Sequence, residues 1–423
     1  MPFNTALSGI RAANTDLKVT GNNIANASTT GFKNSRAEFG DVYASSLLGS
    51  GSNTPGSGVN LQKIRQQFSQ GNLNFTENQL DLAINGAGMF ILDNAGDKLY
   101  GRDGTFGLDK DGYIVNNTGS NLQGFVADDA GNVGGILEDL QVEVDNQPPN
   151  VTTELDISFN LDARKAVPLV TPFDPDDPAS YNNATSATVY DSLGNPHTLS
   201  QYFVKRYDDL NPAPTPAEAN EWDVYVQIDG EDVAITNGVP TVPANPSARN
   251  VTFDSVGALV AGDVFDIAWT PTNGAAPMNI NVDLASSTQY GSGFSVETLS
   301  QDGYTTGRLA GIDIDEQGLI FARFTNGEAQ VIGQVALANF NNLEALKPVG
   351  STLWGQTADS GELIVGAPGS ASFGDIQAGA LEESNVDLSE QLVNLIIAQR
   401  NFQANSKTIE TANQTTQTII NLR

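Results

Sequence analysis

Apolar residues recur at alternating spacings of four and three positions at both ends of the chain, with polar residues among them. Near the start, these positions are Phe3, Leu7, Ile10, Asn14, Leu17, Gly21 and Ile24. Near the end, they are Leu388, Leu392, Leu395, Gln399, Phe402, Ser406, Ile409, Asn413, Thr416 and Ile420. Because this spacing keeps the positions on one helical face, it predicts a heptad-patterned helix at each end.

These two helices have two possible roles. Each could be an amphipathic helix packed on its own domain, or the two could pair with each other and with copies from other chains. Polar residues on a helical seam lower stability but fix register and partner number. The pattern also continues to the chain ends, where most domains fray. We therefore favour a role for these helices in assembly with other chains, and expect them to be only marginally stable in an isolated chain.

The region between the helices is typical of β structure. Turn motifs such as NAGD at 94–97, SLGN at 192–195 and TNGE at 325–328 separate apolar or alternating runs. The clearest hairpin joins 319–324 to 329–337 through Asn326-Gly327. Gly31, in left-handed backbone, and Phe32 are expected to end the first helix. Glycine-rich stretches at 49–58 and 366–374 are predicted to be flexible linkers or loops that separate the helices from the interior.

The expected fold class is therefore multidomain α+β. Long N- and C-terminal helices form a coiled-coil-like domain, and two mainly β domains follow, one inserted in the other. The terminal helical domain with its linkers comprises 1–70 and 370–423, the inner β domain 71–146 and 285–369, and the inserted outer β domain 147–284.

Composition narrows the possible functions. The chain has 423 residues, with 50 acidic and 20 basic side chains, a net charge of -30 and no cysteine. Nucleic acids and anionic membranes attract basic surfaces, so neither is an expected partner. Without cysteine there is no disulfide, thiol nucleophile or Cys metal site. We find neither the apolar run of a Sec signal nor that of a membrane span, so export would need a dedicated route.

Candidate chemistry is sparse. The single histidine, His197, follows Pro196 at a predicted turn and is expected to be an exposed loop side chain rather than part of a triad. The stretch DIDEQG at 313–318 places Phe324 where a calcium loop needs its glutamate, so acidic turns are expected to be solvated. Nothing favours paired carboxylates for glycan cleavage. We therefore expect no enzyme, no cofactor and no metal site.

Both terminal segments resemble a known family. Residues 6–39 and 379–422 are similar to the N- and C-terminal signatures of the flagellar rod and hook family, and residues 302–342 to its hook members in particular. The matching residues of the first signature are Asn22, Asn23, Ala25, Asn26, Thr30, Gly31 and Phe32. Those of the second are Leu381, Glu382, Ser384, Asn385, Val386, Asp387, Gln399, Arg400 and Ala404.

The resemblance implies a structural subunit that self-assembles into the bacterial flagellar hook, the flexible universal joint that transmits torque from rod to filament. It implies a polymer of many copies, with rod proteins, a hook cap protein, a hook–filament junction protein and the flagellar type III export apparatus as partners. The location would be extracellular, reached without a cleaved Sec signal. A distal rod subunit is the alternative, although rod members look shorter, without an insert like 147–284. From another class, a calcium-binding adhesin or a wall hydrolase would leave the terminal helices without a role.

The resemblance also implies a role for the two terminal helices and for the asparagines near the end of the first one. In the family's arrangement the terminal helices line an inner channel, and the amides of Asn22, Asn23 and Asn26 would bond neighbouring subunits. The expected assembly residues are Leu7, Ile10, Leu17, Asn22, Asn23, Ile24, Asn26, Gly31, Phe32, Asn385, Leu392, Leu395, Gln399, Phe402, Ile409 and Ile420.

Overall fold

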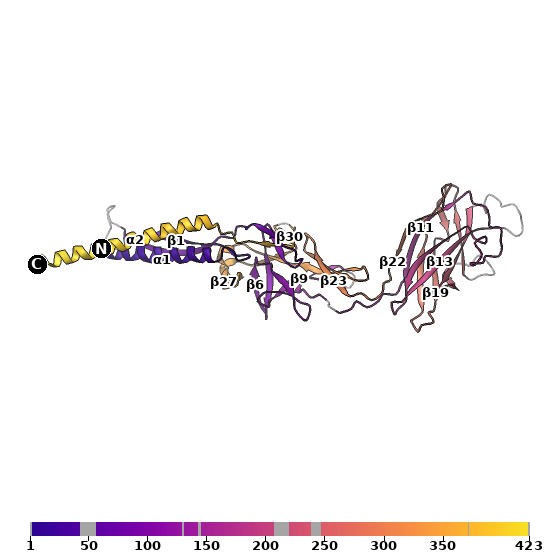
Figure 1. Cartoon of the computed structure of the whole chain (residues 1–423), viewed down its shortest axis with the longest axis horizontal. Helices are drawn as coiled ribbons and strands as arrows, with labels where there is room; N and C mark the ends of the chain where they lie inside the picture. The colour runs from indigo at the N-terminus through magenta and orange to yellow at the C-terminus, as the bar shows by residue number, and fades with distance from the viewer. Residues whose placement is uncertain are drawn as a thin grey trace. The chain divides into compact units, whose positions relative to one another are not determined.

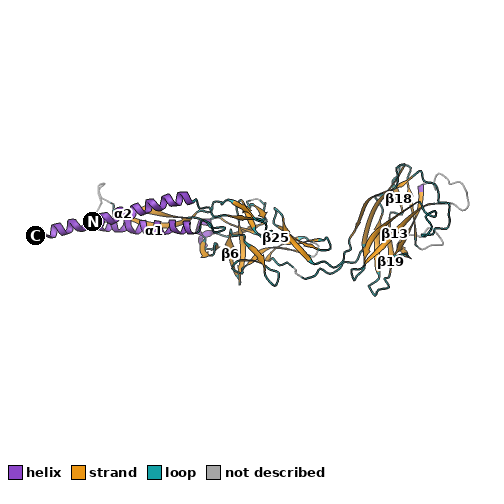
Figure 2. Cartoon of the chain, viewed as in Figure 1, coloured by secondary structure: helices purple, strands orange, loops and turns teal. Residues whose placement is uncertain are grey.

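The computed structural model describes residues 2–42, 56–128, 131–142, 145–206, 220–237, 247–370 and 372–421. The chain divides into two compact units (Figure 1). Unit 1 comprises 1–144, 310–323 and 329–423, and unit 2 comprises 145–309 and 324–328. Both long helices belong to unit 1, and strands dominate the rest (Figure 2). The expected combination of N- and C-terminal helices with mainly β domains is confirmed.

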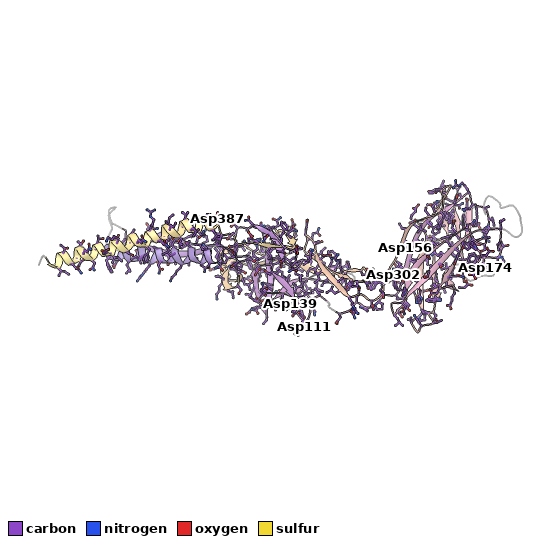
Figure 3. The ribbon with its side chains drawn as sticks, in the orientation of Figure 1. Asp111, Asp139, Asp156, Asp174, Asp302 and Asp387 are labelled. Atoms are coloured by element: carbon purple, nitrogen blue, oxygen red, sulfur yellow. The ribbon has the colours of Figure 1, made fainter. Side chains whose placement is uncertain are left out.

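The two helices are α1 (Pro2–Ala25) and α2 (Leu388–Asn421). Asp387, labelled at the start of α2 in Figure 3, caps that helix because its Oδ1 accepts the N–H groups of Ser389 and Glu390 at 2.8 and 3.1 Å. Helix α1 ends at Ala25, six residues before Gly31. Asparagine side chains compete for backbone groups, and three of them lie at 22, 23 and 26.

Unit 1 is built mainly on a large antiparallel sheet. Among the described residues its main path runs β23-β24-β25-β9-β5-β6-β28-β27. The strands and short helices assigned to this unit are β1 (Ser35–Asp41), β2 (Val59–Gln66), β3 (Leu73–Phe75), β4 (Leu82–Asn85), β5 (Met89–Asn94), β6 (Asp97–Gly101), β7 (Phe106–Leu108), β8 (Ile114–Asn116), β9 (Asn121–Ala127), β10 (Val133–Asp139), β23 (Leu309–Ile314), β24 (Leu319–Phe324), β25 (Ala329–Val335), β26 (Leu337–Phe340), η2 (Leu343–Ala345), β27 (Lys347–Gly350), β28 (Leu353–Gly355), η3 (Ala358–Ser360), β29 (Leu363–Gly366), β30 (Asp375–Ala378) and β31 (Ala380–Glu382). The predicted hairpin is confirmed, since β24 and β25 pair antiparallel.

A second hairpin lies beside α1 and was not predicted. Strands β1 and β2 pair antiparallel, with Ser35 opposite Gln66, and both contact α1. Most of the predicted linker at 49–58 lies between these strands and outside the described residues. The alternation of Val59 and Leu61 with polar residues was a weak signal for β2, because it is too short and breaks at Lys63.

The glycine-rich stretch at 366–374 is packed rather than flexible where the structure describes it, at 366–370 and 372–374. Gly374 donates its N–H to the carbonyl of Ala87 at 2.8 Å, and Gly369 donates to Gly374 at 3.1 Å. The ring of Phe373 occupies the space that a side chain at Gly366 would need. Glycine therefore serves close packing here, and the loop leads directly into β30 of unit 1.

Unit 2 contains two sheets, each six-stranded among the described residues, with orders β16-β19-β20-β11-β21 and β12-β13-β14-β17-β18; β22 joins the first and β15 the second. Its strands are β11 (Glu154–Asp162), β12 (Asn183–Tyr190), β13 (Pro196–Lys205), β14 (Glu221–Ile228), β15 (Glu231–Asp232), β16 (Ala234–Asn237), β17 (Ala248–Phe253), β18 (Leu259–Ala261), β19 (Val264–Trp269), β20 (Met278–Asp283), β21 (Thr288–Tyr290) and β22 (Ser295–Gln301). Fully buried side chains from both sheets, including Phe159, Phe265, Phe203 and Trp222, form one core. The sheets therefore pack face to face.

Residues 285–309 belong to unit 2, whereas the sequence placed a boundary at 284. Strand β22 pairs antiparallel with β11 along its length, and β21 pairs parallel with the end of β11. These pairings join segments more than 120 positions apart. No local pattern marks such a pairing, so the boundary was misplaced.

His197 also differs from expectation, because it lies in β13 and only 11 % of its side chain is exposed. Its Nδ1 is 2.7 Å from Oδ2 of Asp229, and its Nε2 is 3.2 Å from Oδ2 of Asp191. The ring also lies edge-on to Trp269, with 4.8 Å between ring centres. His197 is therefore a largely buried strand residue that contacts side chains at the edge of the unit 2 core, rather than an exposed loop side chain.

Acidic side chains in turns mostly bind backbone N–H groups. Oδ1 of Asp315, in the DIDEQG stretch, accepts from Gln317 and Leu319 at 2.9 and 2.8 Å. Asp302, labelled in Figure 3, accepts from the N–H groups of Thr153 and Glu154 at 2.8 and 3.0 Å. These carboxylates stabilise turns and strand ends.

Candidate assembly surface

The two helices run antiparallel and pack through small residues. On α1, buried positions recur every seven residues at Ala6, Ala13 and Thr20, and Asn23 is also buried; on α2 the buried positions are Gln391 and Ala398. Gly9 lies against the side-chain amide of Asn405, which occupies the place of a side chain at Gly9. Small residues let two helix backbones approach closely, whereas the large apolar residues of the predicted seam are half-buried or exposed.

The amide of Asn23 bonds inside the chain, which differs from the expected contact with a neighbouring subunit. Its Nδ2 donates to the carbonyl of Ser35 at 2.8 Å and to Oε1 of Gln391 at 3.1 Å. Its Oδ1 accepts the N–H of Ser35 at 2.9 Å. Since only 2 % of Asn23 is exposed, this side chain joins α1, β1 and α2.

The other two amides end α1. Nδ2 of Asn26 donates to the carbonyl and to Oδ1 of Asn22 at 3.0 and 2.7 Å, and Oδ1 of Asn26 accepts from the hydroxyl of Thr29 at 3.2 Å. Gly31 then adopts a φ of 67°, which confirms the predicted left-handed backbone. A Cβ there would lie 2.5 Å from the backbone nitrogen of Asp103, so glycine is required.

Helix α2 carries an apolar surface that the rest of the described chain does not cover. We define the exposed apolar face of α2 as Leu388, Leu392, Val393, Ile396, Ile397 and Phe402. These side chains are 37–56 % exposed, although they are large and apolar. Beyond Asn405, α2 continues past the N-terminal end of α1 (Figure 1), and Ile420 there is 67 % exposed. Several exposed large apolar side chains gathered on one helix indicate a site of association.

The structure places the predicted assembly residues in three classes. The exposed ones are Asn22, Leu392, Gln399, Phe402 and Ile420. The half-buried ones are Leu7, Ile10, Leu17, Ile24, Asn26, Phe32, Asn385, Leu395 and Ile409. The buried ones are Asn23 and Gly31.

A groove of about 390 Å³ runs between α1, β1 and the beginning of α2. Its lining includes Asp16, Arg36, Glu390, Asn394 and Ile397. Burial raises the pKa of the Asp16 carboxyl above its ordinary value of 3.8. The groove thus borders the exposed apolar face of α2 through Ile397, and offers both apolar and charged contacts to another molecule.

The segment before α2 is bound tightly to the N-terminal region. Nδ2 of Asn385 donates to the carbonyls of Gln67 and Ser69 at 2.8 and 3.1 Å, while its Oδ1 accepts the N–H of Asn34 at 2.8 Å. Asn385 therefore positions α2 from within the chain. Sequence analysis also missed the buried carboxylate of Glu382, whose presence in the C-terminal signature was its only signal.

Two searches for other kinds of site were negative within the described residues. They contain no group of three or more histidine, aspartate or glutamate side chains arranged to hold a metal ion. None of their helices is long and apolar enough to cross a membrane.

Several known proteins have similar sequences over the whole chain. The flagellar hook protein FlgE of Salmonella typhimurium is 38 % identical over 434 residues, covering 100 % of both chains. The chain belongs to the flagellar hook protein family. The hook protein FlgE of Escherichia coli is 36 % identical over 429 residues, again covering both chains completely, and that of Borreliella burgdorferi is 33 % identical over 450 residues, covering 99 % of this chain and 98 % of the other.

Four family descriptions match successive segments of this hook-family chain. They are "Flagella basal body rod protein" at 3–33, "Flagellar hook protein FlgE/F/G D1 domain" at 83–160, "Flagellar basal body protein FlaE D2 domain" at 160–304 and "Flagellar basal body rod FlgEFG protein C-terminal" at 377–422. The crystal structure of Helicobacter pylori flagellar hook protein FlgE2 has a TM-score of 0.54 and 17 % identity, covering 73 % of this chain and all of that one. That structure supports the fold.

Membership confirms the interpretation as a structural flagellar hook protein rather than an enzyme. It favours neither the distal rod subunit nor the calcium-binding adhesin. A protein of the hook and rod family is part of a polymer in the hook and basal body of the flagellum.

Proposed function

We propose that this chain polymerises into the hook through its terminal helices, and that the exposed apolar face of α2 is the main contact between copies. The observation that carries this proposal is the exposure of six large apolar side chains on one helix in an isolated chain. Burying one such side chain completely contributes about 1.5–3 kcal/mol. A few of them, repeated over many subunits, would hold a tube together.

The predicted assembly residues divide into two roles under this proposal. Leu392, Phe402 and Ile420, with the half-buried Leu395 and Ile409, contact other copies directly. The half-buried seam of α1, at Leu7, Ile10, Leu17 and Ile24, and the amides of Asn22 and Gln399 take part at its edges. Asn23, Asn26, Gly31, Phe32 and Asn385 act indirectly, because they hold the helices in position.

The domain roles extend this picture. The terminal helices form a coiled-coil-like assembly domain, the β region of unit 1 forms the inner wall, and the inserted β domain forms the outer part, with its limits moved to those of unit 2. Such a tube would serve as a flexible joint that transmits torque from rod to filament. Its partners would be rod proteins, a hook cap protein, a hook–filament junction protein and the flagellar export apparatus. The hook would then lie outside the cell, reached without a cleaved Sec signal.

Electron microscopy of the purified chain tests the proposal, with short tubes as the expected result. The double variant Leu392→Ala and Phe402→Ala should form no tubes, while unit 2 melts as in the parent chain. Leu169→Ala is the matched control, because this leucine of unit 2 is 96 % exposed and lies outside the helices. If the double variant forms tubes as readily as the control, the apolar face of α2 is not the contact.

A further inference from the structure

Three buried charged side chains join distant parts of unit 1. Nζ of Lys33 is 2.5 Å from Oε1 of Glu382, and Nη1 of Arg102 is 3.0 Å from Oε2 of the same carboxylate. The side chains of Lys33 and Glu382 are completely buried, and that of Arg102 is 7 % exposed. One carboxylate therefore pairs with two cations in the interior.

Further hydrogen bonds to the backbone hold this cluster. Nζ of Lys33 donates to the carbonyl of Ser69 at 2.8 Å, and Nη2 of Arg102 donates to that of Gly86 at 2.6 Å. Oε1 of Glu382 also accepts the N–H of Gly71 at 2.8 Å. Buried charges are stable only when they are paired and hydrogen-bonded in this way.

The two cations and the carboxylate come from opposite ends of the sequence. Lys33 follows α1 and Arg102 follows β6, whereas Glu382 is the last residue of β31, 349 positions after Lys33. The backbone of the same segment docks beside it, since β31 pairs with β3 and Gly31 donates its N–H to the carbonyl of Glu382 at 2.8 Å. Among the described residues, Glu382 is the ion-pair partner of both cations.

Without the C-terminal segment, the N-terminal part of unit 1 would bury two unpaired like charges. Burial lowers the pKa of both Lys33 and Arg102, and the Glu382 carboxylate opposes each shift. The charge of Arg102 also lowers the pKa of Lys33. Removing one partner of a buried pair is strongly destabilising, because it leaves a charge that neither water nor protein compensates.

Unit 2 has no such requirement. Its core is formed by residues between 151 and 294, and no side chain of that core comes from the C-terminal segment. The described core of unit 2 is therefore complete before residue 382 in the chain.

We propose that Glu382 closes unit 1: docking of the segment at 380–385 supplies the negative charge that lets Lys33 and Arg102 be buried, so the native packing of unit 1 depends on this late part of the chain, while unit 2 forms without it. The dependence concerns folding of the single chain. It holds whether or not the chain polymerises as proposed above.

Native-state hydrogen exchange on the full-length chain tests this, with Glu382→Gln as the central variant. We expect amides of β4 and β30 to exchange roughly 150- to 4,000-fold faster, the range expected when one partner is removed from buried ion pairing. Amides of β13 and β14 in unit 2 should be unchanged. Glu383→Gln is the matched control, because this neighbouring side chain is exposed and should leave both units unchanged.

A second variant tests whether the unpaired charges, rather than the changed shape of the side chain at 382, cause the faster exchange. Adding Lys33→Met to Glu382→Gln removes one of the two unpaired cations, so exchange in unit 1 should slow at least about tenfold relative to Glu382→Gln alone. Three results would overturn the proposal: Glu382→Gln behaving like Glu383→Gln, equal acceleration of unit 2, or no slowing when Lys33→Met is added.

Discussion

Replacing Asn23 by alanine tests whether this amide serves the single chain or the contact between subunits. The substitution removes three hydrogen bonds, two to the backbone of Ser35 and one to Gln391. A bond of this type contributes about 0.5–1.5 kcal/mol. Ser35 is half-buried, so water replaces part of what is lost. We therefore expect the local free energy of opening at the junction of α1, β1 and α2 to fall by about 2–4 kcal/mol.

Hydrogen exchange of the unpolymerised chain measures this opening. A loss of that size corresponds to roughly 30- to 700-fold faster exchange of amides in β1 and in the last turn of α1. Asn22→Ala is the matched control, because it changes the same residue type one position earlier. Asn22 is exposed, and its Oδ1 accepts one bond, from Asn26. Surface substitutions of this kind usually stay within about 0.5 kcal/mol.

The reasoning is refuted if the two variants exchange at the same rate. A pure assembly role for Asn23 would give a different result: Asn23→Ala would leave exchange in the single chain unchanged and would reduce only tube formation. The structure predicts instead that Asn23→Ala accelerates hydrogen exchange in the single chain, before any polymer forms.

Two further predictions concern backbone geometry and pH. Gly31→Ala should lower the melting temperature of unit 1 clearly more than Gly96→Ala, because both glycines have positive φ but only a Cβ at Gly31 meets backbone atoms, at 2.5 Å; equal losses would contradict this. Burial lowers the pKa of His197, but its hydrogen bonds to Asp229 and Asp191 outweigh burial and raise the pKa overall above the ordinary value of 6.5. The stability that protonated His197 adds to unit 2 is therefore complete below pH 6.5 and is lost as pH rises through the folded pKa. Unit 2 should consequently melt at a lower temperature at pH 8.5 than at pH 6. In the variant His197→Gln, the melting temperature of unit 2 should differ less between these two pH values.

Local periodicity in the sequence was enough to predict several elements. The alternation of four and three predicted the two terminal helices, because residues at those spacings share one helical face whatever surrounds them. The turn at Asn326-Gly327 predicted its hairpin, since the geometry of such a turn depends on adjacent residues. Gly31 was assigned to left-handed backbone for the same local reason.

Only the tertiary structure decided which groups meet. The helix seam predicted that large apolar residues would form the contact between α1 and α2, yet the apolar residues most deeply buried on the two helices are Ala6, Ala13 and Ala398. Small residues allow the closest approach of two backbones, and periodicity does not distinguish that face from its neighbour. The large side chains of the seam are half-buried or exposed, which leaves part of their surface for other contacts.

The long-range pairings have the same explanation. Glu382 neutralises Lys33 across 349 positions, and β22 joins β11 across more than 120. Asn23 was noticed in the sequence, but its partners Ser35 and Gln391 were not, because they come from β1 and α2. Periodicity describes neighbours along the chain. The energies of buried charges and strand pairs depend on contacts that exist only once the chain has folded.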